Sequence, residues 1–200
     1  MKYFFINLIF LINIIIIIAI GWFIFGIFSA PNAVNESNEK IPNIILIVVD
    51  TLRADYLSCY GNNFIKTPNI DKLASDGVLF ENVISQSSWT LPSHATLMTS
   101  KYPIQHGALS YNNPLSKSEV TLAETLKANK YTTCAFISTV LVSSKFGFNL
   151  GFDTFDENLD PDYERPVTEF HGKSLKWVKQ NYRKKFFYVI IHKVLGFFFN

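Results

Sequence analysis

The run IILIVVD at residues 44–50 constrains the fold of this chain more than any other segment. A β-branched apolar run of this length is typical of a strand that is buried on both faces, as in a parallel sheet. The run ends in a carboxylate, Asp50, and open α/β sheets bind ligands at the carboxyl ends of their strands. The sequence therefore predicts a buried parallel strand that places Asp50 where it can hold a cation.

A second informative segment, SWTLPSH, places a hydroxyl just ahead of a proline. Pro92 suits the first turn of a helix, and the free backbone N–H groups of such a turn face anions. Thr90 then becomes a candidate nucleophile for a tetrahedral oxyanion ester, activated by a metal that lowers the pKa of its hydroxyl. His94 lies four residues on, on the same helical face, where it would donate to a substrate oxygen or position the hydroxyl.

Strand and helix patterns alternate along the rest of the chain. This alternation predicts an α/β fold with a mixed, mostly parallel sheet flanked by helices. The expected strands lie at 44–49, 78–84, 131–137 and 186–191, and the expected helices at 70–75, from Thr90 onward, at 119–129 and at 168–182, with a polar loop at 106–117 and an acidic loop at 153–165.

Five blocks in order resemble the amino-terminal half of the sulfatase family, a branch of the alkaline phosphatase superfamily. The blocks are PNIILIVVDTLRADYLSCYG, TPNIDKLASDGVLFENV, WTLPSHATLMTSKYPIQHG, TLAETLKANKYTTCAFIS and FGFNLGFDTFD. The first resembles the family's first strand and metal-binding loop, and the third resembles its nucleophile helix. The resemblance runs from about Pro42 to Ile191.

The resemblance implies a metal-dependent enzyme that hydrolyses or transfers sulfate or phosphate esters. Asp50 matches a metal ligand, and Thr90 matches the nucleophile and a further metal ligand. Lys101 and His106 are expected to bind substrate, although Lys101 has the alternative of simply ending its helix, where a cation is favoured. The resemblance favours calcium as the divalent metal ion, with manganese, magnesium or zinc as alternatives.

Three positions depart from the family pattern. Thr90 stands where many sulfatases have the Cys or Ser that becomes formylglycine, and a secondary alcohol cannot form that aldehyde, so no formylglycine is expected. His94 replaces an Arg, and Thr51 replaces the second of two adjacent acidic metal ligands. Thr nucleophiles are familiar in the related phosphoethanolamine and phosphoglycerol transferases. The choice between sulfate and phosphate therefore stays open.

Each candidate residue also has a structural alternative. Thr90 is a suitable N-cap for its helix. Asp50 is able to cap a turn or pair with Arg53. His94 and His106 have the alternative common to isolated histidines, a hydrogen-bonded structural position.

The amino terminus predicts a membrane segment. Residues 3–28 contain no charged residue, and the run exceeds the roughly 20 residues that cross a bilayer as a helix. Residues 1–30 are therefore expected to be an uncleaved transmembrane anchor, with a cleaved signal peptide as the alternative. Residues 31–40 read as a polar linker. Lys2 before the span and acidic residues after it predict a single-pass protein with its catalytic domain extracytoplasmic, either periplasmic or extracellular.

Charge and cysteine content exclude some partners. The net charge of +2, without a basic block, gives no support to nucleic-acid binding. Cys59 and Cys134 are the two cysteines of the chain, and they indicate neither a disulfide framework nor a metal site.

The carboxyl end raises a competing hypothesis. Residues 41–192 read as the amino-terminal part of a sulfatase-like domain, and residues 193–200 as an aberrant tail. The resemblance implies that further metal ligands and substrate-binding residues come later in such proteins, so the chain is expected to be truncated and its fold incomplete. The alternative function is therefore a catalytically inactive remnant or an anchored binding module.

Overall fold

A computed structural model describes residues 41–157 and 167–193 of the chain. The predicted anchor at residues 3–28, the linker at 31–40 and nearly all of the predicted tail lie outside the described residues. Within the described ranges, no helix has both the length and the apolar character needed to cross a membrane.

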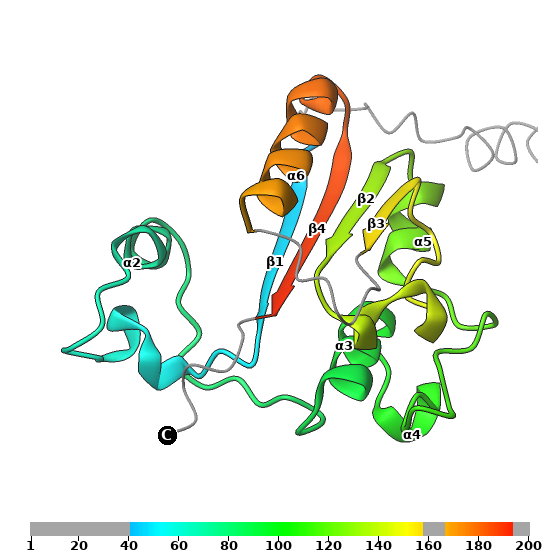
Figure 1. Cartoon of the computed structure of the whole chain (residues 1–200), viewed down its shortest axis with the longest axis horizontal. Coiled ribbons are helices and arrows are strands. Elements are labelled where there is room, and N and C mark those ends of the chain that lie inside the picture. Colours follow the sequence, from blue (N-terminus) through cyan, green and yellow to red (C-terminus); the bar gives the residue numbers. More distant parts are fainter. Residues whose placement is uncertain (1–40, 158–166, 194–200) are drawn as a thin grey trace, which may run out of the picture. The chain divides into compact units, whose positions relative to one another are not determined.

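Four strands form one sheet in the order β1-β4-β2-β3, and every neighbouring pair is parallel (Figure 1). The strands are β1 (Ile44–Asp50), β2 (Thr132–Ile137), β3 (Thr154–Glu157) and β4 (Phe186–Lys193). The prediction of an α/β fold built on a mostly parallel sheet is confirmed, and the sheet of the described residues contains parallel pairs throughout.

The helices connect the strands and flank the sheet. They are α2 (Pro68–Asp76), α3 (Thr90–Thr99), α4 (Pro103–His106), α5 (Leu122–Ala128) and α6 (Val167–Asn181), with 3-10 helices η1 (Ala54–Tyr56), η2 (Ser58–Tyr60), η3 (Val140–Val142) and η4 (Ser144–Phe146). The start of α5 is fixed by a capping box in which Thr121 and Glu124 satisfy each other's backbone N–H groups.

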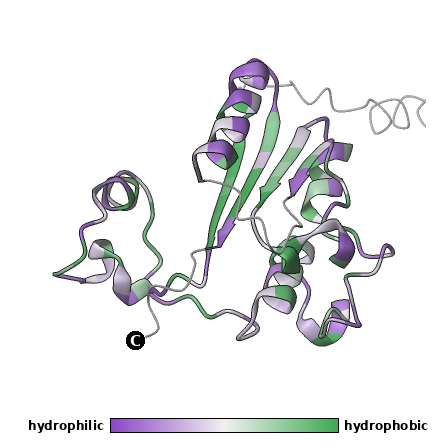
Figure 2. Ribbon diagram, viewed as in Figure 1, coloured by the Kyte–Doolittle hydropathy of each residue, from purple (hydrophilic) through white to green (hydrophobic). Residues whose placement is uncertain are grey.

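Successive strand residues point to opposite faces of the sheet, and each face has its own apolar core. On one face, Leu91, Ala95 and Met98 of α3 pack with alternate strand residues such as Val189 and Ile191. On the other face, α6 presents a periodic stripe to the remaining strand residues. This stripe and its strand partners are Phe170, Trp177, Val178, Cys134, Phe136, Phe186, Tyr188 and Ile190. Figure 2 shows the resulting hydrophobic strands between helices of mixed hydropathy.

The sequence prediction was wrong for two segments. The predicted strand at 78–84 has no regular structure, and its side chains are exposed, with 78% of Val78 and 84% of Ile84 accessible. Conversely, the predicted acidic loop at 153–165 begins with β3, which pairs with β2 through Cys134 and Thr154. Residues with high strand propensity form a strand only where a partner strand is available. Where a partner is available, even an acidic segment can pair with it.

Candidate active site at the carboxyl edge of the sheet

The period of two along β1 determines which face of the sheet Asp50 joins. Asp50 lies on the same face as Leu46 and Val48, which pack against the core beneath α3. It is the last residue of β1, it pairs in register with Lys193, and only 8% of it is exposed. The carboxylate therefore reaches the carboxyl edge of the sheet on the side that α3 covers.

Thr90 meets Asp50 at this edge. Its hydroxyl Oγ1 lies 3.1 Å from Oδ2 and 3.3 Å from Oδ1 of Asp50, and it donates to the carboxylate. The N-cap of α3 is Trp89, so the alternative interpretation of Thr90 as the cap does not hold. Arg53 pairs with Asp55 at 2.6 Å rather than with Asp50. The structure thus brings together the two residues that the sequence placed 40 positions apart.

The first turn of α3 leaves backbone donors free beside this pair. Thr90 and Leu91 are the first two residues of the helix, so their N–H groups have no acceptor within it. Pro92 has no N–H group, and the amide of Ser93 makes a bond of 3.4 Å to the carbonyl of Trp89. Because the amino terminus of a helix favours negative charge, this turn is suited to an anionic ester oxygen.

His94 contacts the same turn through its backbone. Its Nδ1 lies 2.8 Å from the Thr90 carbonyl oxygen, and since a carbonyl only accepts, Nδ1 carries the ring proton. Burial lowers the pKa of the His94 imidazole, so the neutral ring is favoured. Its Nε2 is then an acceptor, and it is buried without a hydrogen-bond partner among the described residues. This tautomer suits positioning of the Thr90 turn better than donation to a substrate oxygen.

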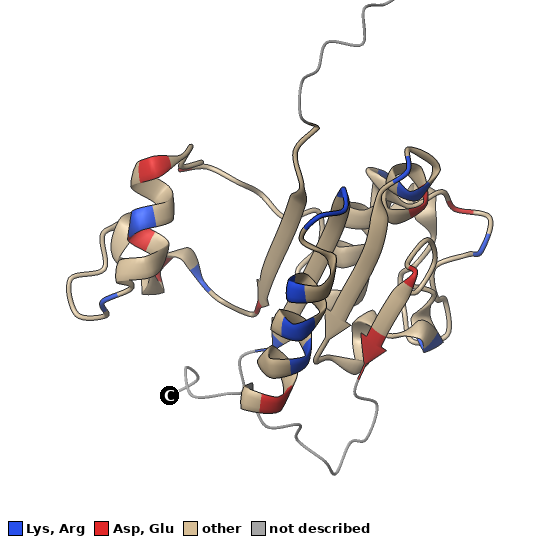
Figure 3. Cartoon of the chain, turned by 90° about the horizontal axis from the view of Figure 1, so that it is seen from above, with Lys and Arg blue, Asp and Glu red and all other residues tan. Residues whose placement is uncertain are grey.

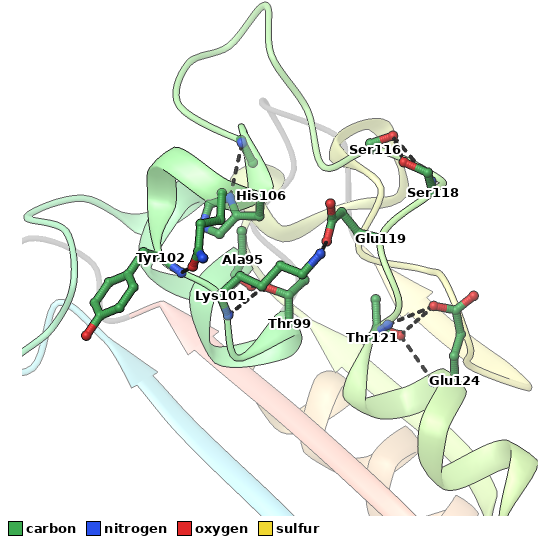
Figure 4. Close-up of polar contacts among 12 residues, drawn as sticks. Ala95, Thr99, Lys101, Tyr102, His106, Ser116, Ser118, Glu119, Thr121 and Glu124 are labelled. Atoms are coloured by element: carbon green, nitrogen blue, oxygen red, sulfur yellow. Dashed lines mark hydrogen bonds and ion pairs between the residues drawn. The ribbon is translucent and has the colours of Figure 1, made fainter.

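Lys101 and His106 are held by other protein groups (Figure 4). Lys101 Nζ lies 2.6 Å from Oε2 of Glu119, whose side chain is 13% exposed. His106 is buried, its Nδ1 accepts from the Ala108 amide, and its Nε2 donates to Thr96 Oγ1, each at 3.1 Å. Substrate binding by either residue would first require breaking these contacts. For His106, the observed contacts match the structural alternative.

Two further residues lie at this edge: Thr51, which the sequence marked only as a departure from the family pattern, and Ser138, which it did not single out. Thr51, directly after Asp50, has a φ of 67°, a left-handed conformation that a β-branched residue rarely adopts. The chain therefore turns sharply at the end of β1. Ser138 follows β2, and its Oγ accepts from the Lys193 amide at 2.9 Å. The rule that singled out Asp50, a polar residue directly after an apolar strand, would have found Ser138.

The oxygen atoms at this edge are of the type that binds a hard cation such as calcium, but they supply few of the ligands that such an ion needs. Asp50 is a buried carboxylate that accepts from one hydroxyl, and both groups offer oxygen atoms, which calcium and magnesium prefer. In the part of the chain that the structure describes, no cluster of three or more His, Cys, Asp or Glu side chains is placed to hold a metal ion. Asp50 and Thr90 would therefore supply two of the six to eight ligands typical of calcium.

A parallel sheet with helices on both faces and polar side chains at its carboxyl edge defines the class of protein, an α/β domain of the kind that binds ligands at that edge. The sulfatase family model matches residues 42–193. The chain belongs to the sulfatase family, whose members include hydrolases of sulfuric esters.

Individual relatives agree with this assignment. The chain is 27% identical over 172 residues to the N-acetylglucosamine-6-O-sulfatase of Bacteroides thetaiotaomicron, an alignment that covers 86% of this chain and 30% of the relative. It is 38% identical over 104 residues to human arylsulfatase H, covering 46% of this chain and 18% of the relative. The matched part of the chain thus covers less than a third of the length of either relative.

Solved structures share the fold. The phosphonate monoester hydrolase of Agrobacterium radiobacter superposes with a TM-score of 0.66 at 21% identity, covering 76% of this chain and 41% of that one. A protein solved in complex with its substrate D-glucosamine-2-N,6-O-disulfate superposes with a TM-score of 0.65 at 23% identity, covering 77% and 34%. At these identities the likeness shows the fold.

Proposed function

We propose that this chain carries the nucleophile of an enzyme that cleaves or transfers sulfate or phosphate esters, with Thr90 as the attacking group. The contact between Thr90 Oγ1 and the buried Asp50 carboxylate is the observation that carries the proposal. A hydroxyl attacks only when its proton is removed or its alkoxide is stabilised, and Asp50 accepts that proton in a hydrogen bond. Membership of the sulfatase family supports the same chemistry.

In the proposed reaction, Thr90 Oγ1 forms a bond to the sulfur or phosphorus atom as the bond to the leaving oxygen breaks, and that oxygen takes a proton from solvent and departs as an alcohol. The hydroxyl proton passes to the Asp50 carboxylate or to solvent. The Thr90 and Leu91 amides bind a charged oxygen of the transferred group, while the His94 Nδ1–H bond to the Thr90 carbonyl holds the turn in place. The oxygen of water or of an acceptor alcohol then bonds to the sulfur or phosphorus atom and gives up its proton, while the bond to Thr90 Oγ1 breaks and Oγ1 regains a proton.

A divalent cation fits this proposal as a cofactor, with Asp50 and Thr90 among its ligands. Such an ion supplies Lewis-acid polarisation of the ester and lowers the pKa of the attacking hydroxyl. Calcium is the first ion to test because oxygen donors dominate this edge.

Replacement of the nucleophile tests the proposal. Turnover of an aryl sulfate and of a phosphodiester would be measured for the full chain and for Thr90→Ala and Thr90→Ser. We expect Thr90→Ala to lower turnover by about two orders of magnitude or more, and Thr90→Ser to retain part of it. Intact-protein mass spectrometry should detect the modified Thr90 during turnover. Equal activity in Thr90→Ala would refute the role of Thr90, whereas ester binding without turnover would favour the binding-module alternative.

The same proposal places the domain outside a membrane, anchored by residues 3–28. The uncharged length of that segment supports the anchor, and Lys2 before it, with Glu36 and Glu39 after it, supports the extracytoplasmic side. Resistance to alkaline extraction, together with protease access to residues 41–193 from the extracytoplasmic side, would agree with it. Full release by alkali would exclude the anchor.

A further inference from the structure

Two histidines meet on the face of the sheet opposite to Asp50. His192 precedes the last residue of β4 and shares the face of Ile190, so it lies beneath α6. His171 lies in the first part of α6, and the centres of the two imidazole rings are 5.6 Å apart. The chain holds four histidines, and the other two lie in or next to the nucleophile helix. This pair is therefore separate from the groups that the proposed reaction uses.

The His192 ring has unused bonding capacity. Its Nδ1 is buried and has no hydrogen-bond partner among the described residues. The ring contacts that surround it are those of Phe170 at 5.7 Å and His171 at 5.6 Å. A buried polar atom without a partner is costly, so an unpaired ring nitrogen needs an explanation.

The spacing of the two rings suits one metal ion. With a metal–nitrogen bond of about 2.1 Å and a tetrahedral angle, the centres of two imidazoles on one zinc ion lie roughly 5 to 6 Å apart. The observed separation falls within this range. Because His171 and His192 are both partly exposed, water can fill the remaining coordination positions.

The charges nearby do not oppose a cation. Lys173 follows His171 on α6, and its Nζ lies 3.3 Å from Glu169 Oε1 and 4.0 Å from Asp156 Oδ2. Two carboxylates thus face the Lys173 ammonium group, and Lys193, next to His192 on β4, presents its side chain to the opposite face of the sheet. Figure 3 shows further lysines along α6, and these follow in later turns of the helix.

From these contacts we infer that His171 and His192 form a binding site for a divalent late transition-metal ion such as Zn²⁺, Ni²⁺ or Co²⁺. Imidazole suits these ions, whereas the oxygen donors of Asp50 and Thr90 suit calcium and magnesium. An ion at this pair would join α6 to the carboxyl end of β4. It would therefore stabilise the packing of α6 on the sheet, in addition to any ion at the nucleophile.

Titration of Ni²⁺ into the full chain, in detergent at neutral pH, tests this site by calorimetry. The variants are His171→Gln and His192→Gln, with Lys176→Gln as a control on the exposed surface of the same helix and Asp50→Asn as a control at the nucleophile. We expect one ion per chain, retained in both controls and weakened at least about tenfold in each histidine variant, since even loss of a group that only orients a ligand costs 10–100-fold.

A second measurement separates misfolding from lost ligation. Thermal unfolding without metal should be similar for the parent and for His171→Gln, and Zn²⁺ should raise the unfolding temperature of the parent and of Lys176→Gln but not of His171→Gln. Absence of binding in the parent, or binding in both histidine variants as tight as in the parent, would overturn the site. Loss of binding in Asp50→Asn alone would assign the ion to the nucleophile instead.

Discussion

The contact between Thr90 and Asp50 should contribute measurably to stability, and its size can be estimated from the structure. Asp50 is 8% exposed, so its carboxylate has little access to water, and Thr90 Oγ1 donates to it at 3.1 Å. Hydrogen bonds to charged groups contribute about 1.5–3 kcal/mol. This bond is longer than the usual 2.7–2.8 Å for O–H···O, which favours the lower end, about 1.5 kcal/mol.

The perturbation is Thr90→Val, which keeps the side-chain shape and removes the donor. We expect the free energy of unfolding to fall by about 1.5 kcal/mol relative to the parent. Thr90→Ser is the matched control because it keeps the hydroxyl and loses only a methyl group. Urea unfolding, followed by the fluorescence of the neighbouring Trp89, would measure both variants in metal-free buffer.

A double-mutant cycle identifies the partner of the hydroxyl. In an Asp50→Asn background the acceptor is neutral, so Thr90→Val should cost less there, about 0.5–1 kcal/mol. The difference between the two backgrounds is the coupling energy of the pair. Equal effects of Thr90→Val in both backgrounds, or an effect no larger than that of Thr90→Ser, would refute the reasoning.

Three further outcomes follow from other parts of the fold. Gly61 and Gly151 both have positive φ, but a methyl group at Gly151 would collide with the backbone at the start of α5, while Gly61 has open space around it. In urea unfolding, Gly61→Ala should lower the free energy of unfolding by about 1 kcal/mol, and Gly151→Ala should lower it by about 2 kcal/mol more. Thr121→Ala should cost about 1–2 kcal/mol by removing the capping box of α5, and Thr121→Ser should restore most of it in the same assay. Burial lowers the pKa of His94 and His106 below the usual 6.5, so at acidic pH the unfolded chain binds more protons than the folded chain. The free energy of unfolding should therefore be full above about pH 6.5 and decline below it. Urea unfolding at a series of pH values would show this decline, and a flat profile would contradict it.

Much of the fold could be predicted because the signals are local. The apolar run of β1 and the helical period of residues 168–182 lie in neighbouring residues, and both appear in the structure close to the predicted positions. The prediction of a strand at 78–84 was wrong because it also rested on local signals alone. Local composition favours an extended chain, but only a neighbouring strand can satisfy its backbone, and the described residues give it none.

The candidate site likewise has features that the local sequence predicts and features that only the tertiary structure shows. The sequence by itself determined that a carboxylate follows a buried strand at Asp50 and that a hydroxyl opens a helix at Thr90, because each depends on adjacent residues. Only the tertiary structure decided that these oxygens meet at 3.1 Å and that His106 has both ring nitrogens engaged within the protein. It also decided that His171 faces His192. Such contacts join residues distant in sequence, and they depend on the face that each strand or helix presents once the sheet and its helices have packed.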